Sequence, residues 1–275
     1  MANAPHLIER AAARLAATGA TQAALVSPAP PPGAACPPAV PRAALERAGL
    51  MACPGRAAEE LWLIQRQILR AAFAPPGAEA AGQPNLLMVT SARPGEGKSF
   101  AALNLAASVA LQGDHPVLLV DADAKDAALS AQIGLREAPG LLDLAAEGGL
   151  DAARLEHPTA LGRLSILPLG RARGRGADLL ASRSVAQLLH GLARRQVERL
   201  VILDAPPCLA SSDPAALAPV VGQALLVVES ERTQRAEVEA ALDLIQDCPA
   251  ITLILNKMRH GGGHAFGAHT PYAAS

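Results

Sequence analysis

Residues 85–99 read NLLMVTSARPGEGKS, an apolar run followed by a turn with two glycines that ends in Lys98 and Ser99. The apolar run has the length and composition of a buried strand, and the residues from Lys98 to about Gln112 read as a helix. A glycine-rich turn between a strand and a helix is the context in which proteins bind phosphate groups. The sequence therefore predicts a phosphate-binding loop at residues 91–99.

The residue types of this loop suit that chemistry. Gly95 and Gly97 let backbone N–H groups turn toward phosphate oxygens, and the helix that follows adds its positive N-terminal end. Lys98 supplies a charge for the β- and γ-phosphates, and Ser99 offers a hydroxyl to Mg²⁺. The strict pattern G-x-x-x-x-G-K-[ST] has glycine at the position of Ala92. The flanking strand and helix make a chance glycine-rich turn the weaker interpretation.

Two further apolar runs end in aspartates. Residues 118–123 read LLVDAD, which places Asp121 and Asp123 at the end of a predicted buried strand. Residues 201–207 read VILDAPP, and Asp204 has the same position there. Facing a triphosphate, such carboxylates could hold Mg²⁺ or accept a proton. For the first pair taken alone, a helix cap or a strand-end turn is the alternative.

The part of the chain from Asn85 onward alternates short apolar runs with helical patterns. These runs are residues 85–90, 117–120, 164–167, 200–203, 225–228 and 252–255. Strands that are apolar throughout imply a parallel sheet covered by helices on both faces. Such sheets bind their ligands at the carboxyl ends of the strands, where the loop and the aspartates follow. We predict an α/β fold with a mostly parallel sheet of the P-loop NTPase type.

The first 84 residues have a different pattern. Helical spacing occurs in residues 4–18, 43–49 and 57–73. Proline-rich linkers are predicted at residues 27–41 and 74–84. The predicted organisation has three parts, which are N-terminal helices with proline-rich linkers (1–84), an ATP-binding P-loop core (85–258) and a flexible tail (259–275).

The composition excludes several classes of protein. Hydrophobic residues make up 51% of the 275 and charged residues 18%, which excludes wholesale disorder. The formal net charge of −1 provides no basic field for nucleic acid, and an aromatic content of 2% provides no stacking platform for single strands. No apolar run reaches the roughly 18 residues of a membrane span, and no export signal is visible. We expect a cytoplasmic protein without a membrane-spanning segment.

The motifs SARPGEGKS, LLVDAD and VILDAPP together resemble those of the bacterial tyrosine kinases (BY-kinases), P-loop proteins of exopolysaccharide and capsule assembly. The resemblance runs from about Leu86 to Met258. It includes PGLLD at 139–143, LPLG at 167–170, DLLAS at 178–182, VVE at 227–229 and LNK at 255–257. The segments LIERA at 7–11 and AEEL at 58–61 look like the soluble exosortase (XrtA)-associated autokinase branch. The resemblance implies an ATP-dependent protein-tyrosine autokinase that regulates exopolysaccharide chain length or export.

The resemblance also implies roles for individual residues. Lys98, Asp121 and Asp123 are implied to be catalytic, with Asp121 as the proton acceptor. Mg²⁺ is implied to bind Ser99, Asp121 and Asp204. The ATP-binding residues implied are Gly95, Glu96, Gly97, Lys98, Ser99, Phe100 and Asn256, the last at the adenine.

The family's tail carries several tyrosines that neighbouring subunits phosphorylate, and this tail keeps Tyr272, the phosphoacceptor candidate. The implied partner is a membrane-bound polysaccharide chain-length or co-polymerase protein. It would place the chain at the inner membrane as a peripheral protein. A homo-oligomer is a further implication. The family's oligomerising helix has Glu followed by Arg three and six residues later, and from Glu59 these positions are Trp62 and Gln65.

Two other functions stay open. The single tail tyrosine fits an ATP-binding regulatory scaffold that kept the fold and lost its phosphoacceptors. A MinD/ParA-like ATPase switch is the other alternative. That group carries a second lysine five residues before the loop lysine, where this chain has Arg93 followed by Pro94. This difference favours the kinase branch.

Overall fold

The structure is a computed structural model that describes residues 37–51, 56–74, 83–112, 114–123, 128–146, 150–171 and 180–258. The chain divides into two units, Met1–Ala34 and Ala35–Ser275, and every described residue belongs to the second. The predicted helix at 4–18, most of the linker at 27–41 and the tail at 259–275 lie outside the described residues.

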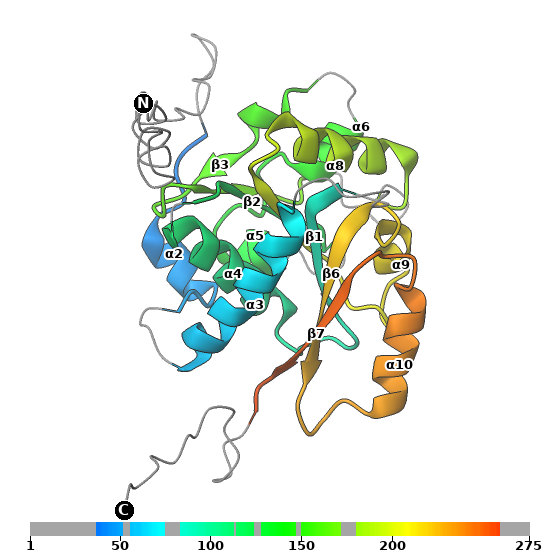
Figure 1. The fold of residues 1–275 in the computed structure, drawn as a ribbon. Coiled ribbons are helices and arrows are strands. Elements are labelled where there is room, and N and C mark those ends of the chain that lie inside the picture. Colours follow the sequence, from blue (N-terminus) through cyan, green and yellow to red (C-terminus); the bar gives the residue numbers. More distant parts are fainter. Residues whose placement is uncertain are drawn as a thin grey trace, which may run out of the picture. The chain divides into compact units, whose positions relative to one another are not determined.

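A seven-stranded sheet forms the centre of the second unit, in the order β3-β4-β2-β5-β1-β6-β7 (Figure 1). The strands are β1 (Gln83–Ser91), β2 (Val117–Asp121), β3 (His157–Pro158), β4 (Leu164–Leu167), β5 (Leu200–Asp204), β6 (Val221–Glu229) and β7 (Ile251–Asn256). Neighbouring strands pair in parallel except β3 and β4. The predicted α/β class with a mostly parallel sheet is confirmed.

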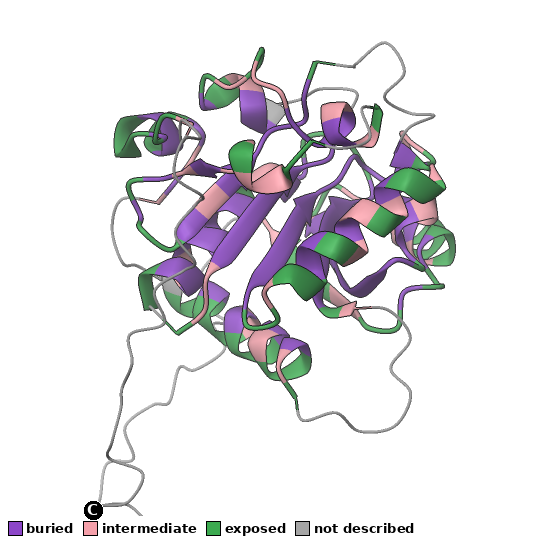
Figure 2. Ribbon diagram, turned by 90° about the horizontal axis from the view of Figure 1, so that it is seen from above, coloured by how far each residue is buried: buried purple, intermediate pink, exposed green. Residues whose placement is uncertain are grey.

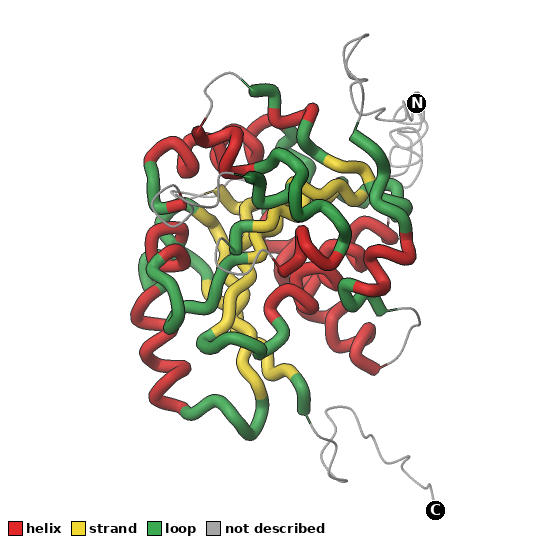
Figure 3. The backbone as a smooth tube through the Cα atoms, turned by 180° about the vertical axis from the view of Figure 1, so that it is seen from behind, coloured by secondary structure: helices red, strands yellow, loops and turns green. Residues whose placement is uncertain are grey.

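Helices cover both faces of this sheet, as the views in Figures 1 and 3 show. The helices are α2 (Arg42–Arg47), α3 (Arg56–Ala72), α4 (Lys98–Gln112), α5 (Ala128–Gln132), α6 (Leu141–Ala146), α8 (Arg183–Arg195), α9 (Asp213–Leu217) and α10 (Arg235–Leu244). A short 3₁₀ helix spans Ala152–Arg154. Among the described residues, no helix has the length and apolarity that crossing a membrane requires.

The alternation of side chains along β1 divides the core in two. Leu86 and Met88 pack in one apolar cluster with residues of α6, α8 and α10, whereas Leu87 and Val89 pack in the other with residues of α2, α3 and α4. Successive strand residues point to opposite faces, so a strand with helices on both sides must be apolar throughout. Figure 2 shows the buried strands between the two helical layers.

The edge strand β7 differs from the prediction of a strand covered on both faces. Leu253 is 49% exposed and Leu255 is 65% exposed. Within the described part of the chain, β7 pairs with β6 alone and ends the sheet. An apolar run therefore does not guarantee burial when the strand lies at an edge.

Helix α3 is fixed to α4 by a buried polar side chain as well as by apolar contacts. Gln65 is fully buried, its amide nitrogen donates to Gln112 Oε1 at 2.7 Å, and its carbonyl accepts from the Ser108 hydroxyl at 2.6 Å. On the outer face of α3, the Arg66 guanidinium lies 4.9 Å from the centre of the Trp62 ring. The predicted division of the chain into three parts at residues 84 and 258 stays a prediction. Helices α2 and α3, which precede residue 84, contribute residues to the same core cluster as α4.

Candidate active site

The three sequence motifs meet at one edge of the sheet. β5 lies between β1 and β2, and these strands run parallel. In the register, Asp204 is opposite both Val89 of β1 and Asp121 of β2. The phosphate loop leaves β1 at this same edge and leads into α4, which begins at Lys98. The carboxyl ends of parallel strands meet at one edge, which explains why motifs far apart in sequence converge.

Lys98 lies at the centre of this cluster. Its Nζ is 2.7 Å from Asp123 Oδ2 and 3.5 Å from Asp204 Oδ1, and it donates to the Ser99 hydroxyl at 3.2 Å. Burial alone would lower the pKa of Lys98, but the charges of Asp204 and Asp123 outweigh this effect and raise it. Lys98 is therefore a cation at neutral pH, as binding phosphate oxygens requires.

Asp204 is the least satisfied carboxylate of the cluster. Both of its carboxylate oxygens are buried and accept no hydrogen bond of good geometry from the residues that the structure describes. Burial raises the pKa of Asp204 to about 6, and the nearby Lys98 ammonium opposes this shift. A buried carboxylate close to the Lys98 ammonium and the Ser99 hydroxyl suits a site where a divalent cation can bind.

The oxygen donors of the cluster fit Mg²⁺. Within the described ranges, no group of three or more His, Cys, Asp or Glu side chains could hold a metal ion by itself. Mg²⁺ usually binds through one or two carboxylates together with substrate phosphates and waters, so it does not need such a group. Of the predicted ligands, Ser99 and Asp204 lie near the Lys98 ammonium, and Asp121 lies opposite Asp204 in the strand register.

Asp121 is held in place by three hydrogen bonds. Its Oδ2 accepts from the backbone N–H of Ser130 at 2.9 Å and from the Ser130 hydroxyl at 2.5 Å, and its Oδ1 accepts from the N–H of Asp123 at 3.2 Å. The Ser130 oxygen in turn accepts from the N–H of Leu169 at 3.1 Å, which leaves its proton for Asp121. Burial raises the pKa of Asp121, and the bonds from Ser130 oppose the shift. Ser130 could not be predicted from the sequence, because no motif marks it.

The two loop glycines have backbone conformations that other residues rarely adopt. The φ angle is +84° at Gly95 and +95° at Gly97. A Cβ atom added to Gly97 would lie 2.3 Å from Asn256 Nδ2, whereas one added to Gly95 would meet nothing within 4 Å. Gly97 is therefore required for two reasons, its backbone conformation and the close approach of Asn256.

The Glu96 side chain is turned into the protein, although the resemblance implies an ATP contact. Its Oε2 accepts from the N–H of Arg93 at 2.7 Å. Its Oε1 accepts from the N–H of Glu229 at 3.2 Å and from the Thr233 hydroxyl. The carboxylate thus joins the loop to the end of β6, and only the backbone N–H of Glu96 is suited to a phosphate.

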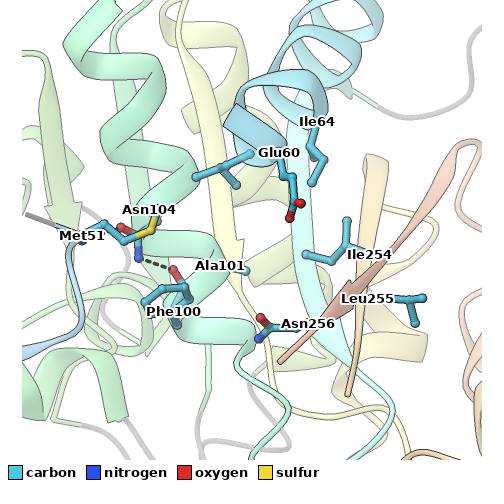
Figure 4. A pocket seen from close by; sticks show the side chains of 10 residues that line it. Met51, Glu60, Ile64, Phe100, Ala101, Asn104, Ile254, Leu255 and Asn256 are labelled. Carbon is cyan, nitrogen blue, oxygen red and sulfur yellow. Dashed lines mark hydrogen bonds between the residues drawn. The ribbon is translucent and has the colours of Figure 1, made fainter. Parts of the chain in front are cut away.

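Asn256 and Phe100 lie together at a small pocket of about 100 Å³ between α3, α4 and β7 (Figure 4). Its lining residues are Met51, Glu60, Leu61, Ile64, Phe100, Ala101, Asn104, Ile254, Leu255 and Asn256. The amide of Asn256 is already engaged, since Nδ2 donates to the Glu96 carbonyl at 2.8 Å and Oδ1 accepts from the N–H of Lys257 at 2.9 Å. The predicted residues thus lie in two groups that the phosphate loop joins. One group is the cluster around Lys98, and the other is Phe100 and Asn256 at the pocket. Tyr272 lies outside the described residues.

Comparisons with known proteins agree with this geometry. No protein-family model matches the chain. A putative tyrosine-protein kinase EpsB of Ralstonia solanacearum is 34% identical over 192 residues, which are 67% of this chain and 25% of EpsB. The tyrosine-protein kinase YwqD of Bacillus subtilis is 32% identical over 171 residues, which are 60% of this chain and 68% of YwqD. The chain spans about a quarter of the length of the EpsB relatives.

Solved structures of kinase domains have the same fold. The kinase domain of VpsO is 28% identical with a TM-score of 0.57, and the match covers 74% of this chain and all of that domain. The kinase domain of Escherichia coli tyrosine kinase ETK is 24% identical with a TM-score of 0.61, and the match covers 76% of this chain and 80% of the ETK chain. Because the YwqD match covers two thirds of that kinase at 32% identity, the chain belongs to the bacterial tyrosine-protein kinase (BY-kinase) family.

Proposed function

We propose that this chain is an ATP-dependent protein-tyrosine autokinase that regulates exopolysaccharide chain length or export, of the exosortase (XrtA)-associated branch. The observation that carries the reaction is the position of the Lys98 ammonium, 2.7 Å from Asp123 and 3.5 Å from Asp204 at the carboxyl edge of the sheet. A cation and carboxylates together are what phosphoryl transfer from ATP needs. The names of the relatives support the tyrosine kinase assignment.

In the proposed reaction, a tyrosine oxygen forms a bond to the γ-phosphorus of ATP, and the bond from that phosphorus to the β–γ bridging oxygen breaks, so that ADP leaves. Lys98 pairs with the terminal phosphate oxygens, and the N–H groups of the loop hold the phosphates. Asp121, oriented by Ser130, accepts the proton of the tyrosine hydroxyl. Ser99, Asp121 and Asp204 would hold Mg²⁺, which would supply positive charge to the β- and γ-phosphates.

The proposed phosphoacceptor is Tyr272. Thirteen positions separate it from Arg259 in the sequence. If the segment behaves as the flexible glycine-rich tail that the sequence predicts, its root-mean-square reach is about 20 Å. This reach suits transfer between touching subunits, which is why we propose a homo-oligomer. The proposed partner is a membrane-bound polysaccharide co-polymerase that recruits the chain, as a cytoplasmic protein, to the inner membrane.

The test is mass spectrometry of the purified chain after incubation with ATP and Mg²⁺, with and without the partner's cytoplasmic segment. We expect phosphate on Tyr272 that is absent in Lys98→Met and in Tyr272→Phe. Phosphotyrosine formation should rise with protein concentration if the transfer is between subunits. Absence of phosphotyrosine under every condition contradicts the kinase proposal.

The single tail tyrosine favours a second candidate, an ATP-binding regulatory scaffold without phosphotransfer. This candidate predicts that the chain binds ATP with Mg²⁺ but forms no phosphotyrosine. A MinD/ParA-like switch has less support, because Arg93 stands where that group has its second lysine. The Arg93 guanidinium forms an ion pair with Glu237 of α10 in the same chain, at 3.2 Å.

A further inference from the structure

The last described residues of the chain contact the phosphate loop. β7 ends at Asn256, and the next residue, Lys257, has a φ of +58°, which residues other than glycine rarely adopt. The Asn256 side chain stabilises this conformation by accepting a hydrogen bond from the N–H of Lys257 at 2.9 Å. The backbone turn directs the Lys257 side chain back toward the loop instead of along the strand direction.

Residues at the end of β7 bind two successive carbonyl groups of the phosphate loop. Lys257 Nζ donates to the Gly95 carbonyl at 2.6 Å, and Asn256 Nδ2 donates to the Glu96 carbonyl at 2.8 Å. Glu229, opposite Asn256 at the end of β6, pairs with the Lys257 ammonium at 3.2 Å. The ammonium is therefore anchored by a carboxylate on one side and binds the loop on the other.

Holding these carbonyls also orients the N–H groups of the loop. In a trans peptide the C=O of one residue and the N–H of the next point in opposite directions. The Gly95 carbonyl points to Lys257, so the N–H of Glu96 points away from β7. The Glu96 carbonyl points to Asn256, so the N–H of Gly97 also points away from β7. Such successive N–H groups, directed to one side, form the concave site that binds anions.

We propose that Lys257 is a positioning residue of the phosphate loop. Its ammonium fixes the peptide unit between Gly95 and Glu96 so that the Glu96 N–H faces the phosphates, and it thereby increases the affinity for nucleotide. This role rests on the proposed function, since it presumes that the loop binds phosphate. The chain has three lysines in total, and this one touches the loop without belonging to it.

The first experiment measures MgADP binding by calorimetry for the wild type, Lys257→Met and Arg232→Met. Arg232 is the matched control, because its guanidinium pairs with the same carboxylate, that of Glu229, at 3.4 Å and lies mostly exposed. We expect Lys257→Met to bind MgADP about tenfold more weakly, because a half-exposed charge-assisted hydrogen bond is lost. Arg232→Met should bind as the wild type does. Lys257→Arg, which keeps the charge and the donors, should recover most of the affinity.

The second experiment separates positioning from chemistry and from folding. With saturating ATP, Lys257→Met should keep the wild-type kcat while its KM for ATP rises, and its melting temperature without nucleotide should stay close to the wild-type value. Glu229→Gln, which weakens the anchor but keeps Lys257, should lose affinity in the same direction and by less.

Wild-type MgADP affinity in Lys257→Met overturns the inference and leaves the proposed function in place. Equal losses in Lys257→Met and Arg232→Met also overturn it, because a general loss of positive charge would then explain the data. A wild-type chain that binds no MgADP overturns the proposed function, and the inference with it.

Discussion

The phosphate loop is held differently on its two sides. On the carboxylate side, defined by Asp121, Asp123 and Asp204 at and just after the ends of β2 and β5, the contacts are between buried charges around Lys98. On the strand-end side, defined by Glu229, Asn256 and Lys257 at and just after the ends of β6 and β7, the contacts are mostly hydrogen bonds to loop backbone. The first arrangement suits groups that bind ligands and move protons, and the second fixes the shape of the loop.

The largest expected effect comes from Lys98→Met on the carboxylate side. The substitution removes the cation for the terminal phosphates, and we expect phosphotyrosine formation to fall by at least about 100-fold. A matched control is Arg235→Met, which removes an exposed cation from α10 and should change the rate little. A folded Lys98→Met chain that keeps the wild-type rate would contradict the role of this side.

The pH dependence of stability is the second test of the same side. Asp204 has a pKa of about 6 in the fold against 3.8 in an ordinary environment. Between these values Asp204 binds more protons in the folded chain than in the unfolded chain, so its contribution to the free energy of unfolding decreases as pH rises from about 4 to about 6. The contribution is at most about 3 kcal/mol. Asp204→Asn cannot take up this proton, so its stability should change less over that range.

Urea unfolding at several pH values in magnesium-free buffer measures this difference. Identical pH slopes in the wild type and in Asp204→Asn would show that burial does not perturb this carboxyl.

On the strand-end side, Glu96→Gln should have the next largest effect. The amide offers only one acceptor oxygen, so either the N–H of Arg93 or the donors Glu229 and Thr233 lose a buried partner. We expect a loss of about 2 kcal/mol in the free energy of unfolding, measured with urea. Glu239→Gln, at an exposed ion pair of α10, is the control and should be close to neutral. Equal stability of the two variants would mean that Glu96 does not brace the loop.

The smallest effect is the difference between Gly97→Ala and Gly95→Ala. Each alanine has an unfavourable positive φ, which costs about 1 kcal/mol. Gly97→Ala should cost about 1 kcal/mol more, because its Cβ forces the Asn256 amide away from the Glu96 carbonyl. Chemical unfolding of both variants measures the difference, and two equal losses would show that Asn256 yields without cost.

The sequence predicts the carboxylate side better than the strand-end side, for a physical reason. Asp121 and Asp204 each follow an apolar strand, and parallel strands bring their ends together whatever the intervening sequence. The direction of the Glu96 side chain depends on partners about 130 residues away, at Glu229 and Thr233, which no local pattern encodes. Ser130 was missed in the same way, because its bonds to Asp121 exist only once α5 has packed.

The edge strand illustrates a second limit of the sequence. The run at residues 252–255 reads TLIL and is nearly as apolar as the central strands. Its place at the end of the strand order, which the local sequence pattern does not encode, leaves Leu253 and Leu255 exposed. The role of Tyr272 stays a prediction, since Tyr272 lies outside the described residues. The exosortase-associated branch also stays a prediction, since the similar proteins are named only as tyrosine-protein kinases.

The buried amide of Gln65 has a consequence for how α3 can move. A helix packed through apolar contacts alone can slide by one turn along its neighbour at modest cost, since one apolar side chain replaces another. Ser108 and Gln112 lie one turn apart on α4, so a one-turn shift of α3 would move Gln65 out of reach of one of them and leave part of its buried amide unpaired. Gln65 therefore fixes the register of α3 on α4, and with it the positions of Trp62 and Arg66 on the outer face of α3.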